Sequence, residues 1–399
     1  MGGEEEINPQ ITQMKKLSPP SHEDTKKMIS AGHGDPALQL QYMQEALVLA
    51  RKGLGKTSPN PMVGAVIVKK GEMVGGGWHK RAGGAHAEIL ALGQAGARAR
   101  GADLYVTLEP CCHFGRTAPC TEAIIAAGIR RVFAAWQDPN PKVNGRGFAA
   151  LRKAGIEVTV GLLEAEARAL NEVYEKYITT GRPFVTLKLA CSLDGKIATG
   201  KGESRWITGE AARKFVHRLR AQNDAVLVGA ATVLADDPEF TVRLARGRQP
   251  RRVILDSRGQ IPSTARILSV SSPSPLLITT SLARKADVER LARAGAEVVV
   301  LPRREARVSL EDLMEALGDR EITSLLVEGG GKLAAGLLEA GLVDKVWFII
   351  APMIIGGEDA PSAVRGRGIE KLSEAWKLEK PQIKRLGGDF AISGNIKKA

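Results

Sequence analysis

Apolar residues follow two different periods along the chain from about residue 35 onward. Leu40, Met43 and Leu47 recur at three- and four-residue steps, which predicts a helix that buries one face. The Asp-Pro pair at 35–36 is typical of a helix start, because aspartate caps a helix and proline suits its first turn. A continuous apolar run at 63–68 then predicts a buried strand.

The alternation of strands and helices continues to residue 180. We predict helices at 86–97, 120–127, 148–154 and 163–178, and strands at 104–108, 132–135 and 156–160. Strands that alternate with helices predict an α/β fold, in which helices cover a sheet.

A turn-forming segment, Thr-Gly-Arg-Pro at 180–183, precedes a second series of elements. Strands are predicted at 184–189, 225–228, 253–255, 276–279, 297–301, 325–327 and 346–350, and helices at 210–220, 281–294, 309–317 and 332–340. No repeat relates the two series, so we expect two different domains. We place them at 35–180 and 181–399, after a polar, flexible tail at 1–34.

Composition narrows the class of partner. The 399 residues are 44% hydrophobic and 25% charged, as in soluble globular proteins. The net charge of +13 favours anionic partners such as nucleic acids, phosphorylated small molecules or membrane surfaces. Only 4% of residues are aromatic, which disfavours single-strand binding by base stacking. The longest apolar run, 347–355, contains Pro352 and is too short to span a bilayer.

The sequence also indicates a compartment. The first six residues are acidic where a secretory signal would be basic, and no apolar segment follows them. The 4 cysteines are too few for a disulfide framework, and three of them fall within ten residues. This clustering favours metal binding or catalysis in a reducing compartment, so we expect a cytoplasmic protein.

The strongest chemical signal is the set His86, Cys111 and Cys120. One imidazole and two thiolates fill three corners of a zinc tetrahedron and leave the fourth for water, which is the catalytic pattern. Taken singly, each residue is more simply a buried cysteine or a helix-capping histidine, but together they favour zinc. Cys112 is an alternative ligand, and we favour Cys111 because it directly follows a Glu-Pro pair.

Glu88 lies two residues after the predicted histidine ligand. Bound zinc lowers the pKa of its water to about 7. A carboxylate beside such a site can stay off the metal and carry protons between the water and a departing amine. Glu88 is therefore the predicted catalytic residue.

These motifs resemble the cytidine/deoxycytidylate deaminase superfamily, in which two residues usually separate the cysteines. Here eight residues separate Cys111 from Cys120. The insert at 113–117, and the segments 60–66 and 77–79, are similar to the deaminase domain of the bifunctional riboflavin-biosynthesis deaminase/reductases. The resemblance covers about residues 37–180 and implies a cytidine-deaminase-like, three-layer α/β/α fold.

The resemblance also implies substrate contacts in this domain. The Asn60 amide would hydrogen-bond a pyrimidine, His79 and His113 would line the pocket, and Arg116 would pair with a 5′-phosphate. As alternatives, Asn60 is a turn residue between two prolines and Arg116 is a solvated loop charge.

Five motifs of the second half, at 187–196, 204–208, 231–238, 255–257 and 327–331, resemble the reductase half of the same enzymes. The resemblance implies a dihydrofolate-reductase-like α/β fold. It implies NADPH contacts at Ala190, Trp206, Thr232, Asp236, Ser257, Gly330, Gly331, Lys332, Leu333, Ala334, Ala335 and Gly336. It implies reductase substrate contacts at Ser204, Arg220, Phe240, Arg243 and Glu328.

The residues themselves support part of this assignment. The segment 327–332 is a strand that runs into a glycine turn and a helix, where backbone N–H groups can approach a pyrophosphate. The turn does not follow the G-x-G-x-x-G spacing, so by itself it is a weak signal. Arg220 and Arg243 suit a ribose phosphate. Phe240 stands where the family has leucine, and Trp206 is alternatively a core residue.

The leading hypothesis is therefore a bifunctional enzyme that uses one zinc ion per chain and NADPH. The first domain would deaminate 2,5-diamino-6-(5-phosphoribosylamino)pyrimidin-4-one hydrolytically to 5-amino-6-(5-phosphoribosylamino)uracil. The second would reduce the ribosyl side chain to ribityl, with the hydride supplied by the coenzyme. The resemblance further implies a homo-oligomer formed through the reductase domain, with no nucleic-acid or membrane partner.

Two other hypotheses differ in class. A nucleic-acid base deaminase with an appended domain would fit the deaminase motifs and the basic charge. The long insert between the cysteines, the low aromatic content and the five reductase motifs oppose it. A zinc-stabilised nucleic-acid-binding protein with a decayed site is opposed by the intact Glu88 beside three intact ligands.

Overall fold

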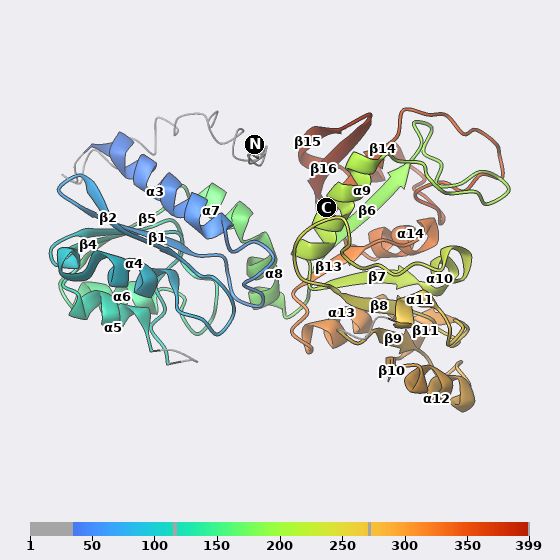
Figure 1. Ribbon diagram of the computed structural model, residues 1–399, viewed down its shortest axis with the longest axis horizontal. Helices are drawn as coiled ribbons and strands as arrows, with labels where there is room; N and C mark the ends of the chain where they lie inside the picture. Colours follow the sequence, from blue (N-terminus) through green and yellow to red (C-terminus); the bar gives the residue numbers. More distant parts are fainter. Residues whose placement is uncertain (1–34, 115–117, 270–272, 398–399) are drawn as a thin grey trace, which may run out of the picture.

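The computed structural model describes residues 35–114, 118–269 and 273–397. The predicted tail at 1–34 lies outside these ranges. Two α/β units stand side by side (Figure 1). The first unit runs from α3 to α8 and the second from β6 to β16; α8 ends at Thr180 and β6 begins at Phe184.

The first unit is built on a five-stranded sheet in the order β2-β1-β3-β4-β5. Strand β1 is antiparallel to both neighbours, and β3, β4 and β5 are parallel. The strands are β1 (Gly64–Lys69), β2 (Glu72–Trp78), β3 (Asp103–Val106), β4 (Arg131–Ala134) and β5 (Glu157–Val160). The helices are α3 (Pro36–Arg51), α4 (Ala87–Ala95), α5 (Cys120–Ala126), α6 (Arg146–Lys153), α7 (Glu164–Leu170) and α8 (Glu172–Thr180), with a 3-10 turn η1 (Gly96–Ala99).

Strand β1 shows why this sheet is covered on both faces. Its side chains alternate: Ala65 and Ile67 pack with α4, α5 and α6, whereas Val66 and Val68 pack with α3 and α7. A strand buried on both faces reads as a continuous apolar run, as the sequence does at 63–68. The expected three-layer α/β/α fold is confirmed.

Glycines bring α4 close to the edge strand β2. A Cβ on Gly77 would lie 2.5 Å from the Ala87 carbonyl oxygen and 2.7 Å from the Ala91 nitrogen. A Cβ on Gly75 would meet the Ala91 oxygen at 2.4 Å. Only glycine permits this backbone contact. The contact fixes the start of α4, where two of the predicted site residues lie.

The second unit has a nine-stranded sheet in the order β10-β9-β8-β7-β13-β6-β14-β16-β15. The first seven of these run parallel, and β16 is antiparallel to both β14 and β15. The strands are β6 (Phe184–Cys191), β7 (Ala225–Gly229), β8 (Arg251–Leu255), β9 (Leu276–Thr279), β10 (Glu297–Val300), β13 (Ser324–Val327), β14 (Lys345–Ile350), β15 (Leu378–Leu386) and β16 (Asp389–Ile396). A small separate ribbon pairs β11 (Arg303–Arg304) with β12 (Arg307–Val308).

Helices cover both faces of the large sheet. Leucines and alanines of α13 and α14 pack on one face, and apolar side chains of α9, α11 and α12 pack on the other. The helices are α9 (Glu210–Gln222), α10 (Ala230–Asp236), α11 (Arg266–Ser269), α12 (Lys285–Arg293), α13 (Leu310–Gly318) and α14 (Gly331–Glu339), with a 3-10 turn η2 (Leu372–Glu374). The α/β fold expected for this half is confirmed.

The predicted helix at 163–178 is wrong as a single element, because it divides into α7 and α8 at Asn171. The side chain of Asn171 is engaged elsewhere: it accepts from the Met62 N–H at 2.8 Å and donates to the Met62 oxygen at 3.0 Å. The strands β2, β15 and β16 were not predicted at all. Their residues lack the apolar pattern that marks the other strands.

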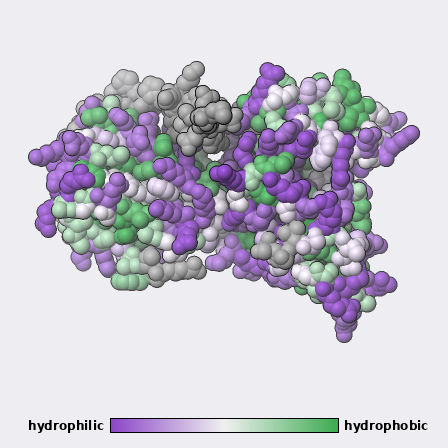
Figure 2. Space-filling view, in the orientation of Figure 1, coloured by the Kyte–Doolittle hydropathy of each residue, from purple (hydrophilic) through white to green (hydrophobic). Residues whose placement is uncertain are grey.

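The surface is largely hydrophilic. Figure 2 shows polar and charged side chains over most of the visible face of both units, most densely around α12 at the lower right. Within the described ranges, none of the helices combines the length and apolarity needed to cross a membrane.

The contact between β2 and α4 yields a stability prediction. Replacing Gly77 by alanine should lower the free energy of unfolding by about 1–3 kcal/mol, because the added methyl group overpacks against the α4 backbone. The matched control is Gly93 of α4, which has no atom within 4 Å of an added Cβ. Gly93→Ala should stabilise the protein by up to about 1 kcal/mol. Urea unfolding followed by circular dichroism measures both, and equal stability of the two variants would contradict the account.

Candidate functional site

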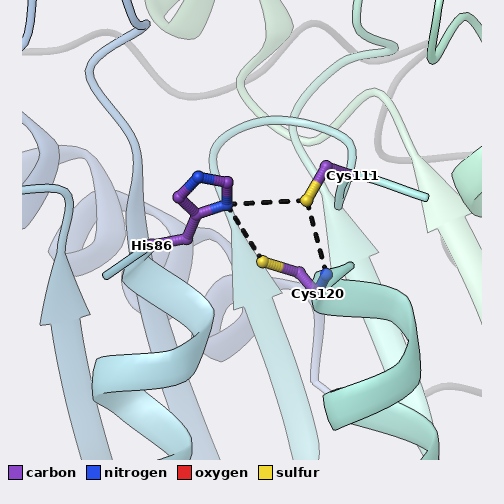
Figure 3. A group of neighbouring side chains, drawn as sticks. All are labelled: His86, Cys111 and Cys120. Carbon is purple, nitrogen blue, oxygen red and sulfur yellow. Dashed lines mark hydrogen bonds between the residues drawn. The ribbon is translucent and has the colours of Figure 1, made fainter. Parts of the chain in front are cut away.

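Three side chains of the first unit converge beside the starts of α4 and α5: His86, Cys111 and Cys120 (Figure 3). His86 stands immediately before α4, Cys120 is the first residue of α5, and Cys111 follows the end of β3. His86 Nδ1 lies 3.2 Å from Cys120 Sγ and 3.5 Å from Cys111 Sγ. The Cys120 N–H donates to Cys111 Sγ at 3.3 Å. The three ligand atoms all lie within 4.8 Å of one another.

The charges of this cluster favour one thiolate. Hydrogen bonds from Cys120 and His86 lower the pKa of Cys111 to about 4, against the effect of burial. The bond to Cys111 raises the pKa of Cys120, and burial raises it further. The bond to Cys111 also raises the pKa of His86. Because metals bind thiolate rather than thiol, the cluster already presents a ligand in its binding form.

The donor set fits zinc. One imidazole nitrogen and two sulfurs from three different segments match a catalytic zinc site with an open fourth position. Among the described residues, the group that could hold a metal contains Cys111 and not its neighbour Cys112. Cys112 is half-buried, and burial raises the pKa of its thiol, which keeps it protonated.

Glu88 lies in the first turn of α4 and is only 3% exposed. Burial raises the pKa of Glu88 to about 7, and the charge on Cys111 adds to this effect. A carboxyl group whose pKa is close to neutral can both accept and release a proton. Glu88 therefore has the protonation behaviour of a general acid and base.

A cavity of about 430 Å³ joins these groups to the other residues predicted for the first domain. His86, Glu88 and Cys111 line it together with Asn60, His79 and His113. Arg116, the predicted phosphate contact, lies outside the described residues. The structure thus brings together the described members of the predicted set around one cavity.

His79 orients Asn60 within this cavity. Its Nδ1 lies 3.1 Å from the Ala85 oxygen, and its Nε2 lies 3.0 Å from Asn60 Nδ2. Burial lowers the pKa of His79, so the ring is neutral. A neutral ring that donates from Nδ1 accepts at Nε2. The Asn60 amide is then fixed as a donor to His79, which leaves its carbonyl oxygen free to face a ligand.

The cavity also contains residues that sequence reasoning missed. Asp138 Oδ1 accepts from the Tyr174 hydroxyl at 2.9 Å and from the Asn140 N–H at 2.8 Å. Burial raises the pKa of Asp138 to about 6. Lys142 and Glu321 complete the wall, and Glu321 belongs to the second unit. The Asp-Pro-Asn-Pro segment at 138–141, directly after a predicted strand, was the available signal for this loop.

The predicted substrate residues of the second unit meet at the end of β13. Glu328 receives a two-pronged ion pair from Arg220, with Nε to Oε1 at 2.6 Å and Nη2 to Oε2 at 2.9 Å. Lys188 Nζ lies 3.8 Å from the same carboxylate. Burial alone would raise the pKa of Glu328, but these two cations hold it below its ordinary value.

Phe240 and Arg243 lie close to Arg220, whereas Ser204 contacts a predicted coenzyme residue. The Arg220 guanidinium stands 5.2 Å from the Phe240 ring centroid. Arg243 Nη1 donates to Thr241 Oγ1 at 2.9 Å. The Ser204 hydroxyl donates to Asp236 Oδ1 at 3.2 Å, which joins a predicted substrate residue to a predicted coenzyme residue.

The predicted coenzyme residues have different surroundings in the structure: some face one another, one is exposed to solvent and two are buried. A Cβ on Gly330 would lie 3.5 Å from Thr232 Oγ1, so the glycine turn and α10 face each other. Trp206 is 69% exposed, which contradicts the alternative of a core residue. Ala334 and Ala335 are both buried, and Ala334 belongs to the hydrophobic core beneath α14. The remaining predicted positions are Ala190 in β6, Ser257 after β8, and Gly331, Lys332, Leu333 and Gly336 in α14.

A second cavity, of about 580 Å³, runs along α14. Its wall includes four basic side chains and one tryptophan: Arg307, Lys332, Arg365, Arg367 and Trp376. Val308, next to Arg307, donates its N–H to Ser257 Oγ at 3.2 Å. The basic cavity therefore adjoins the predicted coenzyme residues.

Comparisons with known proteins match both halves. Residues 37–136 match the family described as "Cytidine and deoxycytidylate deaminase zinc-binding region", and residues 183–392 match "RibD C-terminal domain". The chain is 47% identical to the riboflavin biosynthesis protein RibD of Aquifex aeolicus over 88% of this chain and 96% of the relative. It is 45% identical to RibD of Escherichia coli over 88% of this chain and 97% of the relative.

Solved structures agree. RibD of Acinetobacter baumannii is 38% identical and superposes with a TM-score of 0.83, covering 91% of this chain and all of that chain (100%). A Thermotoga maritima protein described as a diaminohydroxyphosphoribosylaminopyrimidine deaminase/5-amino-6-(5-phosphoribosylamino)uracil reductase is 37% identical. Its TM-score is 0.79, and the match covers 90% of this chain and 99% of that one.

The group of His86, Cys111 and Cys120, here called the metal cluster, yields a prediction about zinc content. The purified wild-type protein should contain about one zinc ion per chain, and His86→Ala or Cys111→Ala should lose at least about nine-tenths of it, because three ligands are the minimum for such a site. Cys112→Ala is the matched control and should keep its zinc. Elemental analysis of dialysed protein measures this. Loss of zinc in Cys112→Ala but not in Cys111→Ala would show that Cys112, and not Cys111, is the zinc ligand.

Proposed function

Because the chain belongs to the RibD family of bifunctional deaminase/reductases of riboflavin biosynthesis, we propose that its two sites act in turn on one phosphoribosyl pyrimidine. The first unit converts 2,5-diamino-6-(5-phosphoribosylamino)pyrimidin-4-one to 5-amino-6-(5-phosphoribosylamino)uracil. The second then reduces the ribosyl side chain to ribityl. The observation that carries this proposal is the single cavity shared by Glu88, the metal cluster and Asn60.

In the first unit, His86, Cys111 and Cys120 hold zinc, which when bound supplies hydroxide at neutral pH. Glu88 would take one proton from the attacking water and pass it to the ring nitrogen beside the attacked carbon. It would then move the remaining hydroxyl proton to the amino nitrogen, which leaves as ammonia while the carbonyl forms. The burial that raises its pKa to about 7 suits both transfers.

The remaining groups of the first unit orient the substrate. Asn60, held by His79 at 3.0 Å, presents its carbonyl oxygen to the edge of the pyrimidine. His113 lines the same cavity, and Lys142 adds a cation to its lining. Arg116 is assigned to the 5′-phosphate on the resemblance alone.

In the second unit, bound NADPH supplies the hydride. The Glu328 carboxylate, kept ionised by Arg220 and Lys188, accepts hydrogen bonds from ribose hydroxyls as the ring opens. Arg220 and Arg243 are the cations proposed for the ribose phosphate, Ser204 is a further proposed substrate contact, and Phe240 packs beside Arg220.

The coenzyme is proposed to lie along the glycine turn at Gly330 and Gly331, with its pyrophosphate at the start of α14. Thr232 faces this turn, since a Cβ on Gly330 would lie 3.5 Å from its Oγ1. Asp236, at the end of the same helix α10, and the exposed Trp206 are assigned to the coenzyme on the resemblance alone. The basic cavity that adjoins Ser257 suits the additional phosphate of NADPH. Because Ala334 is buried in the core, its contribution is the backbone of α14, whereas Ala335 lines the basic cavity.

The protein is further proposed to act in the cytoplasm as a homo-oligomer formed through the second unit, on a small molecule rather than a nucleic acid. In support, β15 pairs with a strand on one side only, and its Ile383 is 70% exposed. An edge strand of this kind is suited to pairing between copies.

Glu88→Gln tests the first reaction. The amide keeps the size of the side chain but cannot carry a proton, so the rate of ammonia release should fall by about 10²–10⁴-fold. Zinc content and reduction of the deaminated substrate with NADPH should stay at wild-type levels, which controls for folding. Ammonia release at a near wild-type rate would remove Glu88 from its proposed role.

Glu328→Gln tests the second reaction. A hydrogen bond to a charged group is worth about 1.5–3 kcal/mol, so the kcat/KM of reduction should fall by about 10–150-fold. The rate of ammonia release, measured on the same preparation, serves as the control and should not change. Undiminished oxidation of NADPH would show that the carboxylate does not bind the substrate.

A further inference from the structure

A hydrogen-bonded cluster joins the two units beside the first cavity. The Ser58 hydroxyl of the first unit donates to Asp224 Oδ2 of the second unit at 2.8 Å. Ser58 Oγ also lies 3.1 Å from Thr323 Oγ1. Ser58 is in the turn in which the Asn60 N–H donates to the Thr57 oxygen at 2.8 Å. A contact from the second unit therefore reaches within two residues of Asn60.

Asp224 is a fixed anchor. Its Oδ2 accepts from the Thr323 N–H at 2.8 Å, the Thr323 hydroxyl at 2.7 Å and the Ser324 N–H at 3.1 Å. Its Oδ1 accepts from Arg248. The side chain is 9% exposed. Since Asp224 directly precedes β7 and Thr323 directly precedes β13, the carboxylate is tied to two central strands of the large sheet.

Asp224 is also ionised. Burial alone would raise its pKa, but Arg248, Thr323 and Ser58 hold the pKa below its ordinary value. A hydrogen bond to an ionised acceptor is shorter and stronger than one between neutral groups. The bond from Ser58 is thus a stronger link between the units than a neutral contact would be.

Two further contacts place the same turn against the second unit. A Cβ on Gly55 would lie 2.9 Å from the Ala221 oxygen at the end of α9, and Gly55 has a φ of +72° that favours glycine. Glu321, two residues before Thr323, lines the cavity of the first unit. The second unit therefore contributes to the wall of the cavity that Asn60 also lines.

We propose that Asp224 is a positioning residue for deamination, although it belongs to the reductase unit. By holding Ser58 it fixes the turn that presents Asn60 to the pyrimidine. The affinity of the first site for its substrate then depends on the second unit, which is a role for that unit beyond reduction. The inference rests on the proposed contact between Asn60 and the substrate.

Ser58→Ala and Asp224→Asn test the proposal in the full-length protein. Each should raise the KM of deamination by about five- to tenfold with little change in kcat, because the turn is loosened while Glu88 and the metal cluster are untouched. Reduction of the deaminated substrate should keep wild-type kinetics in Ser58→Ala, which shows that the second unit remains folded.

The matched control is Lys345→Met, which removes another link between the units. Lys345 Nζ, in β14, pairs with Glu172 Oε1, in α8, at 2.6 Å. This variant should leave the KM of deamination unchanged. An equal rise in KM in Lys345→Met would overturn the proposal, since the effect would then reflect general docking of the units. An unchanged KM in Ser58→Ala and Asp224→Asn would overturn it as well.

Asn60→Ala separates this inference from the proposed function. If Asn60→Ala raises the KM but the Ser58 and Asp224 variants do not, the positioning role fails and the substrate contact stands. If Asn60→Ala leaves the KM unchanged, the proposed substrate contact itself fails, and the positioning role fails with it.

Discussion

A buried carboxylate that accepts several backbone N–H groups holds the first catalytic centre in place. Glu109 receives four such bonds, from the N–H groups of Asp138, Gly145, Gly147 and Phe148, at 2.9–3.2 Å. Donated hydrogen bonds are what permit a carboxylate to remain in a protein interior. Through Glu109, the loop that carries Asp138 is tied to the residue that precedes Pro110-Cys111.

The same loop packs tightly against the segment that carries Cys111, which restricts the movement of the metal cluster. A Cβ on Gly147 would lie only 2.1 Å from the Pro110 oxygen, so the start of α6 presses directly on the segment that carries Cys111. On the opposite side, the glycines of β2 let α4 approach the sheet, which fixes His86 and Glu88. The groups proposed to be catalytic are therefore held by backbone contacts from both sides, which preorganises them as an active site requires. Asp224 has a similar role between the two units: its buried carboxylate accepts backbone N–H groups of the second unit and the Ser58 hydroxyl of the first.

Much of this could be predicted from the sequence. Runs such as 63–68 identified the buried strands because both faces of those strands are apolar, and the His-x-Glu, Pro-Cys and Cys motifs identified the cluster. Strand β2 was not predicted because its three consecutive glycines permit close packing but form no apolar pattern. Strand β15 escaped because most of its residues are exposed. Glu109 and Asp224 could not be found, since the backbone groups that bond Glu109 and the mixed side-chain and backbone partners of Asp224 are distant in sequence, and no residue pattern marks them.

The central claim is that two sites on one chain act in order on one substrate. The most direct measurement is the mass of the products formed by the wild-type enzyme from the diaminopyrimidinone ribosyl phosphate, with and without NADPH. Without NADPH, the account predicts only the replacement of one amino group by oxygen. With NADPH, it predicts that the same product also gains a hydride and a proton. Reduction of the substrate before its amino group is lost would contradict the account. So would a substrate whose mass is unchanged after incubation with the zinc-loaded enzyme.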